Sequence, residues 1–246
     1  MKSLINYKFS FLIAVCLSSS LLFQAEAAQK RLDDERAILK LKVQLKQNPN
    51  DAKALFQMGW YMQKRNFHQQ AQEYYLKCLK NEPRYVSAVI NLGNIAQRMK
   101  KYQRAKGYYL RAIKMQPDSS DAHYNLGTLY IKQKNFFGGI NSFERTLALE
   151  PRNKSALLNL ASIYLVLYKK KPSKHYLKIA KTHLVKASRI DPRYGHVYFN
   201  LARVYEYEDK KSVAIQYYKE AIRFYSRNHR FKRKAQERIV YLRSLM

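Results

Sequence analysis

The sequence predicts an all-α protein in which one antiparallel helix pair is stacked several times to form a solenoid. A small residue recurs with a step of 34 residues, at Gly59, Gly93, Gly127 and Ala161. A proline follows the same step, at Pro49, Pro83, Pro117 and Pro151. A third small-residue series keeps it, at Ala71, Ala105 and Gly139. Three series that share one period are typical of a helical repeat whose copies contact only their neighbours.

The repeat over residues 86–119 shows the two helices most clearly. Leu92 and Gly93 mark the first helix. The second helix carries its small and aromatic markers on one face, at Ala105, Tyr109 and Ala112. Small residues let paired helices approach closely, and Pro117 cannot continue the second helix, so it ends the repeat. These residues resemble the tetratricopeptide repeat family. The resemblance implies a right-handed superhelix whose first helices line the concave surface.

The segment 1–27 is expected to be a cleavable secretory signal peptide. Lys2 and Lys8 precede an apolar run at 9–23, and Ala25 and Ala27 are the small residues that a signal peptidase reads. The run is shorter than the roughly 20 residues that a membrane-spanning helix requires. We therefore expect export, with the bacterial periplasm or outer envelope as the location. An uncleaved membrane anchor is one alternative, and a lipoprotein attached at Cys16 is a weaker one, because Val15 stands before it where a small residue is expected.

Capping helices are expected at both ends of the solenoid. Residues 28–49 form the first, since 31–47 keeps the helical phase and Pro49 ends it. Five repeats follow, at 52–85, 86–119, 120–153, 154–194 and 195–228. Residues 229–246 form a basic C-terminal cap. Its apolar face holds Phe231, Ala235, Ile239, Leu242 and Leu245. Its charged face, expected to meet solvent, holds Lys232, Arg233, Lys234, Arg238 and Arg243.

The fourth repeat is seven residues longer than the others. Ala161 and Ala202 are 41 residues apart, whereas Ala180 and Ala214 return to the step of 34. Seven residues are close to two helical turns, so each helix of this pair is expected to gain about one turn. The protruding tip then carries Lys169, Lys170 and Lys171. The tip is either simply solvated or a docking point for an anion.

Composition indicates the class of partner and offers no sign of catalysis. The chain has 47 Lys and Arg against 17 Asp and Glu, a net charge of +30. Such a charge favours acidic partners or anionic surfaces. The sequence has no His-Glu-x-x-His motif, glycine-rich phosphate loop or Gly-x-Ser-x-Gly motif, and its six histidines are scattered. We expect a non-enzymatic protein without metal or cofactor.

The resemblance places the candidate binding residues on the first helices. Two residues before each small-residue marker, the sequence has Gln57, Asn91, Asn125, Asn159 and Asn200. One residue earlier it has Phe56, Ile90, Tyr124, Leu158 and Phe199. Amides can donate to and accept from the main chain of an extended peptide. Trp60 shares a helical face with Phe56. The alternative is that the asparagines are inherited framework and that some of the apolar residues pack against neighbouring helices.

Two functional hypotheses follow. The first is a protein–protein interaction scaffold or assembly factor of the cell envelope, which binds an extended acidic segment in the concave groove. A basic row five residues after the marker would pair with that segment, at Lys64, Arg98 and Lys132. The second is an electrostatic binder of acidic lipid, envelope polysaccharide or, least expected in an exported protein, nucleic acid. It would use the lysines of the fourth repeat together with Arg230, Lys232, Arg233 and Lys234.

Overall fold

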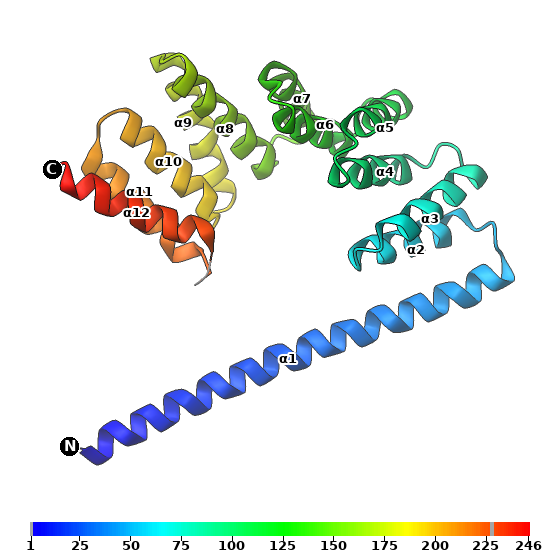
Figure 1. The fold of residues 1–246 in the computed structure, drawn as a ribbon, viewed down its shortest axis with the longest axis horizontal. Coiled ribbons are helices and arrows are strands. Elements are labelled where there is room, and N and C mark those ends of the chain that lie inside the picture. Colours follow the sequence, from blue (N-terminus) through cyan, green and yellow to red (C-terminus); the bar gives the residue numbers. More distant parts are fainter. Residues whose placement is uncertain (1, 227–228) are drawn as a thin grey trace. The chain divides into compact units, whose positions relative to one another are not determined.

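The computed structural model describes residues 2–226 and 229–246, with side chains from residue 24 onward, and these residues form α-helices and no strand (Figure 1). Twelve helices lie within the described residues: α1 (Lys2–Gln47), α2 (Ala52–Lys64), α3 (His68–Asn81), α4 (Val86–Arg98), α5 (Tyr102–Met115), α6 (Ser120–Lys132), α7 (Phe136–Leu149), α8 (Lys154–Lys170), α9 (Lys174–Ile190), α10 (Gly195–Tyr207), α11 (Lys211–Phe224) and α12 (Arg230–Ser244). They pack in sequential pairs, as the fold class predicts.

The chain divides into two compact parts. The N-terminal part is Met1–Ala88 and the C-terminal part is Val89–Met246. In the N-terminal part α1 packs on α2 and α2 pairs with α3. In the C-terminal part α6 pairs with α7, α8 with α9, and α10 with α11, and α12 packs on α11. Three-residue turns such as 65–67 make the two helices of a pair antiparallel.

Three of the first helices, α2, α6 and α8, begin at side-chain caps, whereas α10 begins at Tyr194 without one. The carboxylate of Asp51 accepts from the Ala54 amide at 2.9 Å, and the Asn153 side chain accepts from the Ala156 amide at 3.0 Å. Ser119 caps α6 in the same way. A cap satisfies an amide that has no partner within its own helix. The proline two residues before each of these caps ends the preceding repeat.

The small-residue marker exists because an aromatic ring of the second helix covers it. A Cβ atom added to Gly59 would lie 2.6 Å from the Tyr75 ring, and one added to Gly93 would lie 2.5 Å from the Tyr109 ring. Gly127 lies under Phe143 in the same way. Because real Cβ contacts are longer than this, glycine lets the two helices approach across these rings.

The third repeat has two consecutive glycines in α7, which lower its helix propensity by roughly 1 kcal/mol each. Close packing explains both. A Cβ on Gly139 would lie 3.0 Å from the Ile163 side chain of α8, and one on Gly138 would lie 2.9 Å from the Tyr130 ring of α6. The two glycines therefore weaken α7 as an isolated helix, but they let it pack closely against α6 and α8.

The fourth repeat divides its insertion between its two helices. α8 and α9 both have 17 residues, whereas α6 and α10 have 13 and α7 and α11 have 14. The first helix thus gains four residues and the second gains three, about one turn each, as expected. Lys169, Lys170 and Lys171 are exposed at this end of the pair.

The N-terminal cap region is part of a longer helix. Ile38 and Leu41 of α1 are buried, and Asp34 forms an ion pair with Lys64 of α2 at 2.5 Å. α1 continues through residue 27 toward the N-terminus. Residue 1 and the side chains of 2–23, on which most of the signal-peptide prediction rests, lie outside the described residues, as do 227 and 228 at the end of the fifth repeat. Over the side chains described from residue 24 onward, the helices include none with the length and apolarity to cross a bilayer.

The C-terminal cap α12 differs from its prediction at two residues. Ala235, Ile239 and Leu242 are buried as expected, but Leu245 is exposed. Arg238, expected on the solvent face, turns toward α10 and forms an ion pair with Glu206. α12 spans about four turns, and Arg238 lies at the edge of its apolar face. Because an arginine side chain is long, its charged end can reach an acidic partner beside the helix.

Candidate functional site

The first helices of the C-terminal part form its inner side. α6 contacts α8, α8 contacts α10, and α10 contacts α12. The second helices α7, α9 and α11 are all described, and they lie farther from one another than these first helices do. Helices that lie closer together occupy the inside of a curved stack. The predicted binding residues of α6, α8 and α10 are on these inner helices.

The asparagines predicted to hold a peptide, Asn91, Asn125, Asn159 and Asn200, form a series that we call the asparagine ladder, and this ladder is partly accessible. Asn91, Asn125 and Asn159 are half-buried, and the Asn159 side-chain amide donates to the Tyr124 hydroxyl at 3.2 Å. This bond links two successive first helices, α6 and α8. Asn200 differs, since it is buried and its amide donates to the main-chain carbonyl of His196 at 3.0 Å. The ladder available at the surface therefore has three rungs in the C-terminal part.

Most of the predicted apolar row belongs to the core. Ile90, Leu158 and Phe199 are buried. Tyr124 is half-buried with its ring edge against Phe143 at a centroid distance of 5.6 Å. Burial raises the pKa of the Tyr124 hydroxyl, so this group stays protonated and can donate as well as accept.

A separate surface lies in the N-terminal part. A cavity of about 530 Å³ between α1 and α2 is lined by Ala37, Lys40, Leu41, Gln44, Phe56, Gln57, Trp60 and Tyr61. Trp60 is 44% exposed, and the Lys64 ammonium lies 5.2 Å from its ring centroid. Phe56 instead stacks on Tyr85 at 4.9 Å. Trp60 is thus the accessible aromatic residue of this pair.

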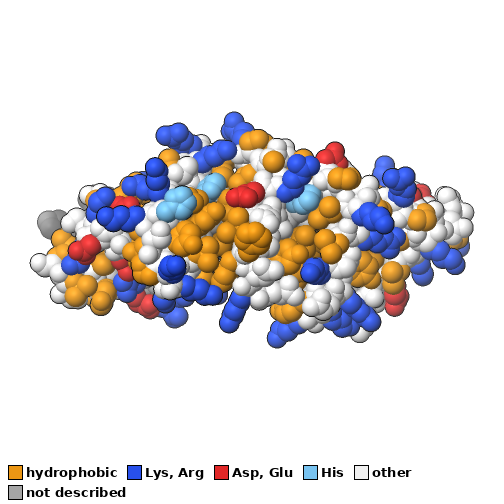
Figure 2. Space-filling model, turned by 90° about the horizontal axis from the view of Figure 1, so that it is seen from above, with side chains coloured by type: hydrophobic (Ala, Val, Ile, Leu, Met, Phe, Trp, Pro, Cys, Tyr) orange, Lys and Arg blue, Asp and Glu red, His pale blue; other side chains and the backbone are white. Residues whose placement is uncertain are grey.

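The predicted basic row is uneven. Lys64 is engaged by Asp34, whereas Arg98 and Lys132 are exposed. The basic residues expected to bind anionic surfaces differ among themselves as well. Lys169, Lys170, Lys171, Arg230, Arg233 and Lys234 are exposed, and Lys232 is half-buried. Arg233 forms an ion pair with Glu237 at 3.5 Å. Figure 2 shows Lys and Arg side chains spread over the visible face, where Asp and Glu are sparse.

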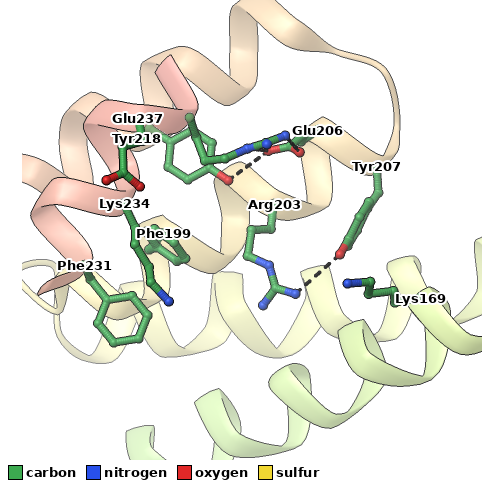
Figure 3. A pocket seen from close by; sticks show the side chains of 10 residues that line it. Lys169, Phe199, Arg203, Glu206, Tyr207, Tyr218, Phe231, Lys234 and Glu237 are labelled. Atoms are coloured by element: carbon green, nitrogen blue, oxygen red, sulfur yellow. Dashed lines mark hydrogen bonds and ion pairs between the residues drawn. The ribbon is translucent and has the colours of Figure 1, made fainter. Parts of the chain in front are cut away.

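A pocket that the sequence did not indicate lies at the C-terminal end of the inner side. It has a volume of about 580 Å³, and residues from the described helices α8, α10, α11 and α12 line it (Figure 3). The lining is Lys169, Phe199, Arg203, Glu206, Tyr207, Tyr218, Phe231, Lys234, Glu237 and Arg238. The packing of α12 against α10 and α11, together with that of α8 against α10, brings these residues together, and no local spacing in the sequence reveals it.

A polar cluster closes one wall of this pocket. Glu206 accepts from the Tyr218 hydroxyl at 2.9 Å and from Arg238 Nε at 3.3 Å. Burial, followed by the nearby Glu206 carboxylate, raises the pKa of Tyr218 far above its usual range. Glu206 is therefore satisfied by two donors and Arg238 by one carboxylate, so this wall is structural.

Three cations of the pocket have no carboxylate partner among the described residues. Arg203 donates to the Asn200 side chain at 3.1 Å and to the Tyr207 hydroxyl at 3.4 Å, both neutral groups. Lys234 lies 5.7 Å from the Phe231 ring centroid, and Lys169 is exposed at the tip of α8. The arrangement suits an anion. Within the described side chains, no three potential ligands gather to hold a metal ion.

Comparison with known families agrees with this architecture. Two family models described as tetratricopeptide repeat match residues 90–136 and 195–228. These two segments of the chain are therefore tetratricopeptide repeats. Proteins of this family generally mediate protein–protein interactions, and their scaffold is typically non-catalytic. No curated protein matches the sequence.

Solved structures share the fold at low sequence identity. Pseudomonas aeruginosa pilF has 21% identity and a TM-score of 0.71, covering 85% of this chain and 91% of that one. YrrB, described as a tetratricopeptide repeat protein with an unusual peptide-binding site, has 18% identity, a TM-score of 0.60, and coverage of 80% and 97%. Yeast Tom70 has 17% identity, a TM-score of 0.69, and coverage of 85% of this chain and 43% of Tom70.

Proposed function

We propose that this tetratricopeptide repeat protein is a non-enzymatic scaffold or assembly factor that holds an extended, acidic segment of another protein on its inner side. The observation that carries the proposal is the accessible amide row on the inner helices. Asn125 and Asn159 are half-buried, and the hydrogen bond from Asn159 to Tyr124 fixes the amide and the aromatic residue beside each other. YrrB, with its peptide-binding site, supports a peptide as the ligand class.

Each of the two parts of the chain presents its own groups for the proposed capture. The amides of Asn91, Asn125 and Asn159 hold the main chain of the segment, because an amide can donate and accept at once. Tyr124 supplies apolar contact in the C-terminal part. Trp60 does so in the N-terminal part, and partly exposed Trp and Tyr are frequent hot spots of binding. The net charge of +30 steers an acidic partner toward the surface.

We place this activity in the cell envelope. The proposal rests on the positive start, the apolar run and the small residues at Ala25 and Ala27, which together form a signal for export. After cleavage the chain would begin at Ala28, and α1 would keep the residues that pack on α2, Ile38 and Leu41. Amino-terminal sequencing of the protein from envelope fractions tests this, and an intact Met1 would contradict cleavage.

The test of the binding proposal is a cross-linking pull-down from envelope extract with residues 28–246. The variant Asn125→Ala with Asn159→Ala removes two rungs of the ladder. Its matched control, Asn141→Ala with Gln216→Ala, removes two exposed amides from the second helices α7 and α11. We expect the ladder variant to lose a discrete partner and the control to retain it. Normal capture by the ladder variant would overturn the proposal.

A second candidate is electrostatic binding to an anionic polymer or lipid, which the exposed Lys169, Lys170 and Lys171 favour. Salt separates the two candidates, because polyanion binding weakens steeply as salt rises and groove recognition keeps a salt-resistant part. The pull-down is therefore run at low and high NaCl. Heterogeneous anionic material that is lost at high salt from all three proteins would favour this second candidate.

A further inference from the structure

We propose that the pocket between α8, α10 and α12 is the subsite that reads the acidic residues of the bound segment. It would take carboxylate side chains spaced about three residues apart, with an aromatic side chain between them. This inference rests on the proposed function and adds the chemistry of the ligand. It concerns a part of the inner side that lies beyond the asparagine ladder.

The charges around the pocket leave a cationic row without acidic partners. Of its two carboxylates, Glu206 is held by Arg238 and Tyr218, and Glu237 pairs with Arg233 at 3.5 Å. The remaining cations are Lys169, Arg203 and Lys234, which make no ion pair with a described residue. Figure 3 shows their nitrogen atoms along one side of the pocket.

The spacing of this row predicts the spacing in the ligand. One cation comes from each of three successive inner helices, α8, α10 and α12. Packed helices lie about 8–10 Å apart. A peptide in the polyproline II conformation advances about 3.1 Å per residue and presents every third side chain on the same face, so it passes from one helix to the next in roughly three residues. A segment that crosses the three helices would therefore meet one cation about every third residue.

The walls of the pocket predict the aromatic residue. Phe199, Tyr207 and Phe231 contribute rings to the lining, and Phe231 packs edge-on against Phe199 at 5.1 Å. Phe231 also lies under the cations of Lys234 and Arg230, at 5.7 Å and 4.9 Å. An aromatic side chain can pack on these rings, and a volume of about 580 Å³ has room for more than one side chain.

A row of three cations favours several acidic side chains over a single terminal carboxylate. One carboxylate would neutralise one of Lys169, Arg203 and Lys234 and leave the others unpaired. Several acidic side chains would pair with all three cations, and such charge complementarity favours the matched ligand over a single carboxylate. A terminal carboxylate is therefore an outcome that the test must distinguish.

The probe is a fluorescein-labelled synthetic peptide with three glutamates at every third position and one phenylalanine between two of them. Binding to the full chain is measured by fluorescence anisotropy at about 150 mM NaCl. A peptide of the same composition with adjacent glutamates tests spacing. A peptide with glutamine in place of glutamate and a free C-terminal carboxylate tests the terminal group. The spaced peptide is amidated at its C-terminus.

Two double variants with equal change in charge test the site. Lys169→Gln with Lys234→Gln removes two cations of the pocket. Lys178→Gln with Lys219→Gln removes two exposed lysines of the second helices α9 and α11. All four side chains are exposed, so the fold is kept. We expect the pocket variant to bind the spaced peptide about tenfold more weakly, since close charge pairs contribute about that much. The control should change affinity less than about twofold.

Equal weakening of binding by the two double variants would overturn the inference, and so would equal affinity for the peptides with adjacent and with spaced glutamates. Tightest binding by the glutamine peptide with the free carboxylate would overturn it too, as would the absence of binding by any peptide. Asn125→Ala with Asn159→Ala separates this failure from that of the proposed function. If the asparagine variant loses its envelope partner while the pocket variant captures it normally, the scaffold proposal is supported and the acidic subsite is wrong. If it keeps its partner and the pocket variant loses its own, the ladder falls instead.

Discussion

The 34-residue period has its cause in single contacts between a small residue and a ring. Gly93 lies under Tyr109, whose hydroxyl donates to the Asn94 side chain at 2.8 Å, so the ring is held in place. Burial raises the pKa of Tyr109 far above its usual range, which keeps this donor protonated. The ring cannot move away from a new methyl group without breaking that bond. The contact therefore fixes glycine at this position.

Two glycine-to-alanine changes test this reading in opposite directions. Gly93→Ala places a methyl group 2.5 Å from the Tyr109 ring, and we expect it to lower the free energy of unfolding by about 1–3 kcal/mol. Gly107 lies on an exposed face of α5, where an added Cβ would meet no atom within 4 Å apart from its own stretch of helix. We expect Gly107→Ala to raise the free energy of unfolding by up to about 1 kcal/mol through helix propensity. Urea unfolding measures both. Equal effects in the two variants would show that packing does not set the marker.

His196 makes stability depend on pH. Burial lowers its pKa first, and the neighbouring His229 and Arg230 lower it further. The other groups against it are neutral, since its ring packs on Tyr194, Tyr225 and Phe231. Tyr225 places its hydroxyl 3.1 Å from Nδ1. No described carboxylate faces the ring to stabilise a positive charge.

We therefore expect the protein to lose stability as pH falls below about 6.5, the pKa of an unfolded histidine. Below that pH the unfolded chain binds a proton that folded His196 still rejects, so the proton favours unfolding. The loss levels off once the pH passes the lowered folded pKa. Thermal unfolding at about pH 7.5 and pH 5.5 measures it. His196→Gln should show a smaller loss, with a remainder from His183, whose pKa burial also lowers. An equal loss in the variant would exclude His196 as the source.

At the scale of elements, the turns of four helix pairs use one backbone motif, and the α8–α9 turn of the longer fourth repeat does not. Asn66, Lys100, Lys134 and Asp209 have positive φ angles of 64°, 59°, 59° and 56°. Around Lys134 the main-chain amides of residues 134 and 135 donate to the carbonyls of Ile131 and Tyr130, at 3.0 and 2.9 Å. This pair of bonds closes the C-terminus of α6 in a Schellman motif. A residue with a Cβ pays about 1–2 kcal/mol for this left-handed conformation.

Glycine at the turn should relieve that strain. We expect Lys134→Gly to raise the free energy of unfolding by up to about 1 kcal/mol, because glycine adopts a positive φ without the Cβ clash. Arg145→Gly removes the same charge from an exposed site inside α7, and we expect it to lower stability by about 1 kcal/mol. Chemical denaturation of both variants gives the comparison. Destabilisation by Lys134→Gly would mean that the lysine makes contacts that outweigh its strain.

At the scale of the whole molecule, the sequence predicted what repeats and missed what occurs once. The ring over Gly93 recurs at Gly59 and Gly127, so its steric demand appears as a period. The pairing of Arg238 with Glu206 occurs once and joins residues 32 positions apart, so no periodic pattern in the sequence indicates it. Asn200 occupies the same place in its repeat as Asn159, yet its own neighbours Arg203 and His196 occupy its side chain. The pocket between α8, α10 and α12 depends on these single contacts.

The net charge of +30 makes a prediction about the chain as a whole. Like charges repel more strongly in the compact state than in the expanded one. Screening shortens from about 30 Å at 0.01 M salt to about 8 Å at 0.15 M, so added salt should relieve this repulsion. We expect the melting temperature to rise by several degrees over this range of NaCl, since roughly 1 kcal/mol corresponds to about 2–4 °C for a chain of this size.

A charge variant distinguishes screening of repulsion from other effects of salt. Changing the exposed Lys114, Lys178 and Lys219 to glutamate removes two charges at each position, or six in all, and lowers the net charge from +30 to +24. The variant should melt higher than the parent at low salt and gain less from added NaCl, because less repulsion is left to screen. An unchanged salt response would show that repulsion among these surface lysines does not set it.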